Sequence, residues 1–346
     1  MSDNASEEEQ QQQMQEIFIC ADVWLGVFAF ISPFELGQIM ALISDRLDVL
    51  VDVHFKSREW ALERLLILRE NDGNGAEIAN RSRELQPIPQ EPLPNKLIGF
   101  KDLQICYINQ TVIEFLQRFR RLFDFSETTV YIGTYEHQNR SWEIIWQKIW
   151  PLVNDNICGF VLAADQLDHL RQFSPAILPN CPNLRSIDSW GIFPELPGED
   201  NANASSNQAV AKWLITPRGD GRPKILRCGF YRRGMEGIKR SFVNALEPIN
   251  FIITFELLST VVIKPFELKN NWTRERLTLR QMDERNWLLM RCPIGREEDK
   301  WTKWEKEAIE LGWDNQWNFI DIIFTENSDI GDVILDANEG PSEPNK

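Results

Sequence analysis

The chain has 346 residues, which is more than one average domain and predicts either two domains or one domain with a substantial appendage. Hydrophobic residues make up 43% and aromatic residues 11%, enough to build a core, so a fully disordered chain is excluded. Acidic residues outnumber basic ones by 52 to 37, giving a net charge of -15. Nucleic acid and anionic membranes are therefore not expected as main partners.

Residues 1–16 are acidic and Gln-rich, and we expect a solvated tail. They lack the basic and apolar regions of a signal peptide, and no apolar stretch in the chain is long enough for a membrane span. Six cysteines are scattered singly without a C-x-x-C pair. These features together predict reduced thiols and a cytoplasmic or nuclear location.

Residues 17–70 have a helical pattern of apolar positions. Asp22 is predicted to cap a first helix, and Pro33 to open a second one. Two or three short helices bury little surface, and these apolar stripes are wide for so small a unit. We therefore expect a partner, or the rest of the chain, to cover one of them.

The same stretch resembles the F-box. The resemblance rests on spacing more than identity, in Ile19-Cys20-Ala21-Asp22-Val23-Trp24 followed by Val27-Phe28, Ile31, Glu35-Leu36 and Leu42-Ile43. Cys20 stands where the family usually has proline. Residues 41–46, 51–55 and 267–272 further resemble an expanded group of nematode F-box proteins, which extends the resemblance over most of the chain.

This resemblance implies a substrate receptor of a cullin-RING ubiquitin ligase, which is not itself an enzyme and needs no cofactor. An F-box docks on a Skp-type adaptor and through it on a cullin, while the rest of the chain presents a target protein. The adaptor-binding residues that it implies are Ile19, Val23, Trp24, Val27, Phe28, Ile31, Leu36, Leu42 and Ile43. An ordinary helical cap on the following domain, in a scaffold with no ligase link, is the alternative.

Residues 71–95 are rich in glycine and proline and are predicted to be a linker. Residues 96–325 then alternate strand-like and helix-like segments, which predicts parallel pairing in an α/β domain. The predicted strands are 103–108, 130–135, 159–163, 184–187, 225–230 and 251–255. The predicted helices between them are 112–123, 142–152, 167–173, 209–214 and 235–246.

Residues 181–187 look like the strand turn of a leucine-rich repeat, which favours a curved, leucine-rich-repeat-like stack. Beyond residue 250 the pattern is typical of an antiparallel meander over 251–262, 276–279 and 287–291. A charged helix (297–311) and a last strand (317–324) follow, which we expect to pack as a lid on the end of the sheet. Residues 326–346 are predicted to be a second acidic tail.

Little in the sequence points to chemistry. His169 and Cys181 could form a nucleophile pair, although a histidine on a helix surface is far commoner. Zinc-ligand spacing is missing. Arg118, Arg120 and Arg121 end a predicted helix and could help to hold an acidic or phosphorylated target. A carboxylate-dependent α/β enzyme with a deep pocket remains a further alternative.

Overall fold

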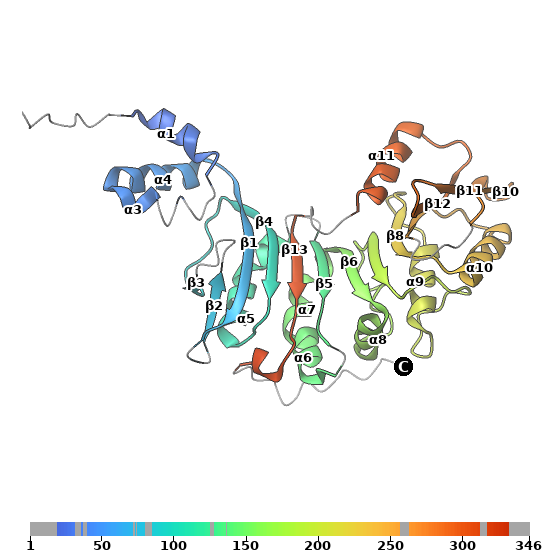
Figure 1. The fold of residues 1–346 in the computed structure, drawn as a ribbon, viewed down its shortest axis with the longest axis horizontal. Helices are drawn as coiled ribbons and strands as arrows, with labels where there is room; N and C mark the ends of the chain where they lie inside the picture. Colours follow the sequence, from blue (N-terminus) through green and yellow to red (C-terminus); the bar gives the residue numbers. More distant parts are fainter. Residues whose placement is uncertain are drawn as a thin grey trace, which may run out of the picture. The chain divides into compact units, whose positions relative to one another are not determined.

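A computed structural model describes residues 19–31, 36, 40–71, 73, 75–79, 85–124, 128–135, 137–256, 263–311 and 317–331 (Figure 1). The predicted tail at 1–16 lies outside these residues, as does the predicted tail at 326–346 beyond residue 331. The chain divides into two compact units, Met1–Trp60 and Ala61–Lys346.

The first unit is helical, with α1 (Ala21–Phe28), α3 (Ala41–Ile43) and α4 (Asp45–Ser57). Helix α4 begins at a good N-cap, because the Ser44 side chain accepts a hydrogen bond from the backbone N–H of Leu47. The predicted cap at Asp22 is wrong. Helix α1 begins two residues earlier, with Cys20 at the N-cap, and Asp22 lies in the first turn, where its charge interacts favourably with the helix dipole.

The second unit contains one 13-stranded sheet. Its strands are β1 (Trp60–Arg69), β2 (Ala76–Ala79), β3 (Leu85–Pro87), β4 (Leu97–Ile105), β5 (Thr128–Ile132), β6 (Ile157–Ala163), β7 (Ser186–Trp190), β8 (Lys224–Gly229), β9 (Phe251–Glu256), β10 (Phe266–Asn270), β11 (Glu275–Gln281), β12 (Asn286–Pro293) and β13 (Phe319–Ile322). Across the sheet they follow the order β10-β11-β12-β9-β8-β7-β6-β5-β13-β4-β1-β2-β3. The prediction of a mixed α/β fold is confirmed.

Strands β5 to β9 are neighbours in chain order and pair in parallel, as the strand–helix alternation predicts. The connections contain α6 (Asn139–Ile144), the π-helical turn η2 (Ile145–Ile149), α7 (Trp150–Val153), η3 (Asn154–Asn156), α8 (Ala164–Phe173), α9 (Ser206–Ile215) and α10 (Arg232–Val243), while α5 (Gln110–Asp124) joins β4 to β5. Beyond β9, strands β12, β11 and β10 pair in an antiparallel manner, which confirms the predicted meander.

The two faces of the sheet are covered differently. Trp150 of α7 stacks on Phe160 of β6, and α5 contacts both α7 and β4. Ile225 and Ile252 are paired across β8 and β9 and point to the opposite face, where they pack against Trp301 of α11 (Glu298–Ile309). Helix α11 therefore covers the second face over β8, β9 and β12 (Figure 1).

The last strand does not form a lid. Strand β13 inserts between β4 and β5 and pairs in parallel with both, so a segment from the end of the chain completes the centre of the sheet. Its buried apolar residues, Ile320 and Ile322, explain why it is drawn into the core and not onto an end.

Two further boundaries differ from the sequence prediction. Residues 60–69 form β1 and not a helix, because their apolar run is paired within the sheet. The predicted linker contributes the short edge strands β2 and β3, and Pro87 is tolerated on the edge strand β3. At the other end, the 3₁₀ turn η5 (Asn327–Asp329) and a bridge between Ile108 and Ile330 continue the ordered chain past residue 326.

Candidate functional site

The first unit has a small core of its own. Phe28, Leu36, Leu47 and Val51 are buried, and the partly buried Trp24 packs on Phe28 with 5.9 Å between the ring centroids. Phe28 and Leu36 are among the predicted adaptor-binding residues, and the structure places both of them in this core. With 0% and 1% of their surface exposed, they hold the helices together and offer no area to a partner.

Other predicted residues lie on the outside of this core. Four of them are largely exposed: Val23 at 52%, Val27 at 41%, Leu42 at 78% and Ile43 at 61%. Ile19, Trp24 and Ile31 are half-buried. Of the nine predicted adaptor-binding residues, four are thus exposed, three are half-buried and two are buried in the core.

Three more exposed apolar side chains were missed by the sequence analysis, namely Phe30 at 92%, Val49 at 62% and Val53 at 43%. Val49 and Val53 are four residues apart on α4 and share one face of the helix, which is the signal that could have found them. We call Val23, Val27, Phe30, Leu42, Ile43, Val49 and Val53 the exposed apolar set. So many large apolar side chains outside so small a core are unusual for a surface that meets only water.

Helix α4 carries a buried histidine, His54, whose Nδ1 atom has no hydrogen-bond partner among the described residues. His54 of α4 is buried, with its ring edge-on to Phe28 at 5.8 Å. Burial, aided by the charge of Arg58, holds its pKa below the usual value, so the neutral imidazole serves as core. His54 is therefore a packing residue of the first unit.

In the second unit, a row of polar side chains crosses the sheet on the face that carries α11. By register, Gln104 of β4, Asp321 of β13 and Tyr131 of β5 are lateral neighbours. Asp102 of β4 lies nearby and forms an ion pair with Arg64 of β1, with 3.0 Å between Asp102 Oδ2 and Arg64 Nε. Loss of water and repulsion from Asp102 raise the pKa of Asp321 to about 7.

This raised pKa predicts a specific pH dependence of stability. Because the folded chain holds a proton on Asp321 that the unfolded chain releases above about pH 4, the unfavourable contribution of this carboxylate is present above pH 7 and absent near pH 4. Asp321→Asn is expected to stabilise the fold at pH 8 by on the order of 1 kcal/mol, or about 2–4 °C in Tm, with a much smaller gain at pH 4.5. Thermal melts at the two pH values measure this, and an equal effect at both would contradict it.

The candidate nucleophile pair does not form a reactive site. Cys181 is buried, and burial raises the pKa of its thiol to about 12, the opposite of what a nucleophile needs. His169 stacks on Trp142 with 5.0 Å between the centroids. Within the part of the chain that the structure describes, no group of three or more His, Cys, Asp or Glu side chains is placed to hold a metal ion.

Arg118 and Arg121 of α5 serve a structural role. Arg118 donates to the carbonyl oxygen of Pro89 at 2.8 Å, and Arg121 donates to those of Leu93, at 3.2 Å, and Pro94. These bonds fasten the proline-rich segment to the helix. They occupy guanidinium N–H groups that would otherwise be able to bind a phosphorylated target.

No family model, no curated protein and no solved structure matches the chain. Over the described residues, none of the helices combines the length and the apolar character needed to cross a membrane. The site must therefore be interpreted from its own residues.

Proposed function

We propose that this chain is a substrate receptor of a cullin-RING ubiquitin ligase that acts in the cytoplasm or nucleus. In this proposal the first unit is an F-box that docks on a Skp-type adaptor, and the second unit binds the target protein. The chain performs no chemistry of its own and uses no cofactor.

The observation that carries the proposal is the exposed apolar set of the first unit. Its side chains come from α1, α3 and α4 and from the turn after α1, around a core of only a few buried residues. Apolar helical surface of this kind is what a helix-packing interface buries, and such an interface supplies the core that a short bundle lacks. Four members of this set, Val23, Val27, Leu42 and Ile43, also belong to the F-box spacing, which supports an adaptor as the partner.

The architecture of the second unit is compatible with a receptor role. The consecutive parallel strands β5 to β9, which are joined by helical connections, support a leucine-rich-repeat-like stack. The face opposite α7 is covered by α11 over β8, β9 and β12, and it carries the polar row of β4, β13 and β5. We assign this face to the target.

The test uses two neighbouring members of the exposed apolar set, Leu42 and Ile43, which are 78% and 61% exposed. The double variant Leu42→Asp with Ile43→Asp is expected to lose roughly 30-fold or more in affinity for a purified Skp-type adaptor, or about 2 kcal/mol, because charged groups would be buried at the interface. Isothermal titration calorimetry with the full chain measures the loss, and circular dichroism checks the fold.

A matched control is available in the second unit. Leu246 is also apolar and 75% exposed, so Leu246→Asp should leave adaptor affinity unchanged. Full adaptor affinity in the Leu42–Ile43 double variant would refute the proposed docking surface. No measurable adaptor affinity in the unaltered chain would refute the ligase function itself and favour the stand-alone scaffold.

A further inference from the structure

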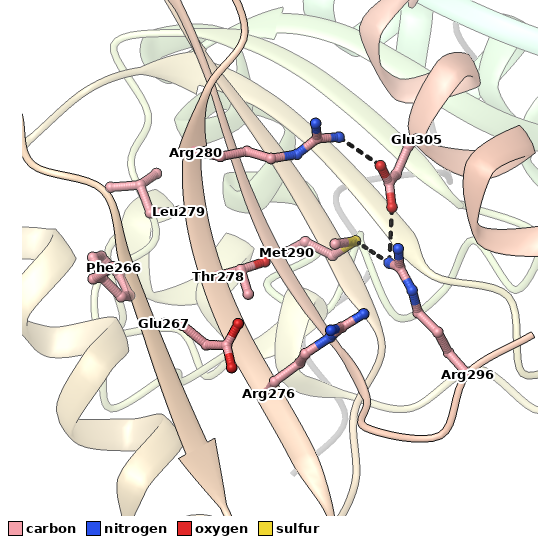
Figure 2. Close-up of a pocket in the computed structure, with 9 residues that line it drawn as sticks. All are labelled: Phe266, Glu267, Arg276, Thr278, Leu279, Arg280, Met290, Arg296 and Glu305. Carbon is pink, nitrogen blue, oxygen red and sulfur yellow. Dashed lines mark hydrogen bonds and ion pairs between the residues drawn. The ribbon is translucent and has the colours of Figure 1, made fainter. Parts of the chain in front are cut away.

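A pocket of about 410 Å³ lies on the α11 face of the antiparallel end of the sheet (Figure 2). Its floor is built by β10, β11 and β12, and its wall by α11 together with the turn that precedes this helix. Met290 contributes apolar surface to the floor, and Glu267 of β10, which is paired with Thr278, contributes a carboxylate. This volume is large enough for an amino-acid side chain that carries a modifying group, and not only for a small ion.

The floor carries two arginines separated by a threonine. Arg276, Thr278 and Arg280 alternate along β11, so all three point to the face of the sheet that carries α11. The register confirms this, because Thr278 is paired with Met290, which packs in the α11 cluster. Lys269 of β10 is paired with Arg276 by register, and its ammonium group forms an ion pair with Glu267 at 3.4 Å.

The pocket already holds one oxyanion of its own. The Glu305 carboxylate accepts from Arg280 at 2.6 Å and from Arg296 at 2.8 Å, so it bridges two guanidinium groups (Figure 2). Arg296 is further occupied by Glu298, to which its Nη2 donates at 2.8 Å. Glu305 therefore shows that the space between these arginines accepts a negatively charged oxygen pair.

Arg276 and Arg280 retain capacity to bind more. Among the described residues, Arg280 donates only through Nη2, and its side chain is 48% exposed. Arg276 has a single long contact of 3.5 Å to Glu298, and its Nε has no hydrogen-bond partner within the described chain. Two under-used guanidinium groups with a hydroxyl between them form an anion receptor, even though the whole chain carries a net charge of -15.

We propose that this pocket binds a phosphate monoester, carried on a phosphorylated serine or threonine side chain of a partner. A phosphate has three terminal oxygens and close to two negative charges, so it can engage Arg276, Arg280 and the Thr278 hydroxyl together. The apolar surface of Met290 accommodates the carbon atoms of the phosphorylated side chain. The site stands on the second unit alone and does not depend on adaptor docking.

The competing interpretation is a purely structural network that fastens α11 to the sheet. The two interpretations differ at Glu305. If the network is only structural, Glu305→Gln weakens the attachment of α11 and creates no affinity for an anion. If the pocket is a phosphate site, Glu305→Gln removes a competing negative charge and should tighten phosphate binding several-fold.

The experiment titrates the full chain by calorimetry with an N-acetylated Ala-phosphothreonine-Ala amide, its unphosphorylated form and glycerol 3-phosphate, at constant ionic strength. We expect saturable binding of the phosphotripeptide, no binding of the unphosphorylated peptide, and at least a fivefold weaker interaction with glycerol 3-phosphate. Arg276→Ala and Arg280→Ala should each lower the phosphotripeptide affinity about tenfold.

Arg64→Ala is the control, because Arg64 of β1 is 54% exposed, close to the 48% of Arg280, pairs with Asp102 of β4 and lies outside the pocket. It should leave the affinity unchanged. Absence of saturable binding, or unaltered affinity in both pocket variants, would overturn the site. Equal affinity for glycerol 3-phosphate would overturn the assignment to a phosphorylated side chain, and unchanged or weaker binding by Glu305→Gln would overturn the role given to Glu305.

Discussion

Replacing Glu275 by alanine is expected to lower the free energy of unfolding of the second unit by about 3–5 kcal/mol. Glu275 of β11 and Arg291 of β12 form an ion pair at 2.7 Å whose side chains are only 1% and 2% exposed. Removing the carboxylate leaves a guanidinium group in the interior without its counter-charge. Such an uncompensated buried charge is among the largest single-residue losses that a protein sustains.

Both side chains of the ion pair make further contacts, so we expect the loss in unfolding free energy to lie in the upper part of this range. Glu275 also accepts from the backbone N–H of Ile249 at 2.7 Å, and Arg291 donates to the carbonyl oxygen of Glu247 at 3.0 Å. The Arg291 guanidinium lies over the Phe242 ring of α10, 5.3 Å from its centroid. The pair thus ties the meander to the segment that connects α10 to β9.

Urea denaturation followed by circular dichroism measures this loss. Glu236→Ala is the matched control, because Glu236 forms an exposed pair with Lys239 on α10, and its removal should change stability by less than about 1 kcal/mol. The double variant Glu275→Leu with Arg291→Met should recover much of the loss, since apolar residues of similar volume carry no unpaired charge. A loss at Glu275 no larger than at Glu236 would contradict the expectation.

Segments with a clear period could be predicted from the sequence. Strands β5 to β9 and the helices between them lie close to their predicted positions, since buried parallel strands show as short runs of β-branched and aromatic residues, as in Phe251–Glu256. The helical pattern predicted for residues 17–70 includes Trp60–Arg69, where Leu62, Leu65 and Leu66 also satisfy a helical period. Pairing within the sheet decided between the two structures, and a local pattern does not contain that information.

The order of the strands could not be predicted either. Nothing local to Phe319–Ile322 indicates that it lies between β4 and β5, because that placement depends on which gap in the sheet is left open. The phosphate pocket has the same origin. The alternation of Arg276, Thr278 and Arg280 is visible in the sequence, but Arg296 and Glu305 reach them only through the packing of α11 on the sheet.

The second large effect on stability is expected at Phe28, a predicted adaptor-binding residue that is fully buried in the core of the first unit. Phe28→Ala is expected to cost about 3–5 kcal/mol, because a fully buried aromatic ring is lost from a core with few other members. A helical unit this small has little stability to spare, so we expect it to unfold locally while the second unit stays folded. Hydrogen exchange measured by mass spectrometry would show faster exchange in residues 21–28 and 45–57, with the sheet unchanged.

Phe30 gives the matched comparison, since it is the same residue type two positions later and is 92% exposed. Phe30→Ala should leave hydrogen exchange in the free chain unchanged, because its side chain has almost no contacts to lose. In the proposed receptor it should nevertheless weaken adaptor binding, whereas Phe28→Ala weakens it only through unfolding. Equal exchange rates in the two variants would show that the division between core and surface within the first unit is wrong, and with it the basis for treating that surface as unfinished without a partner.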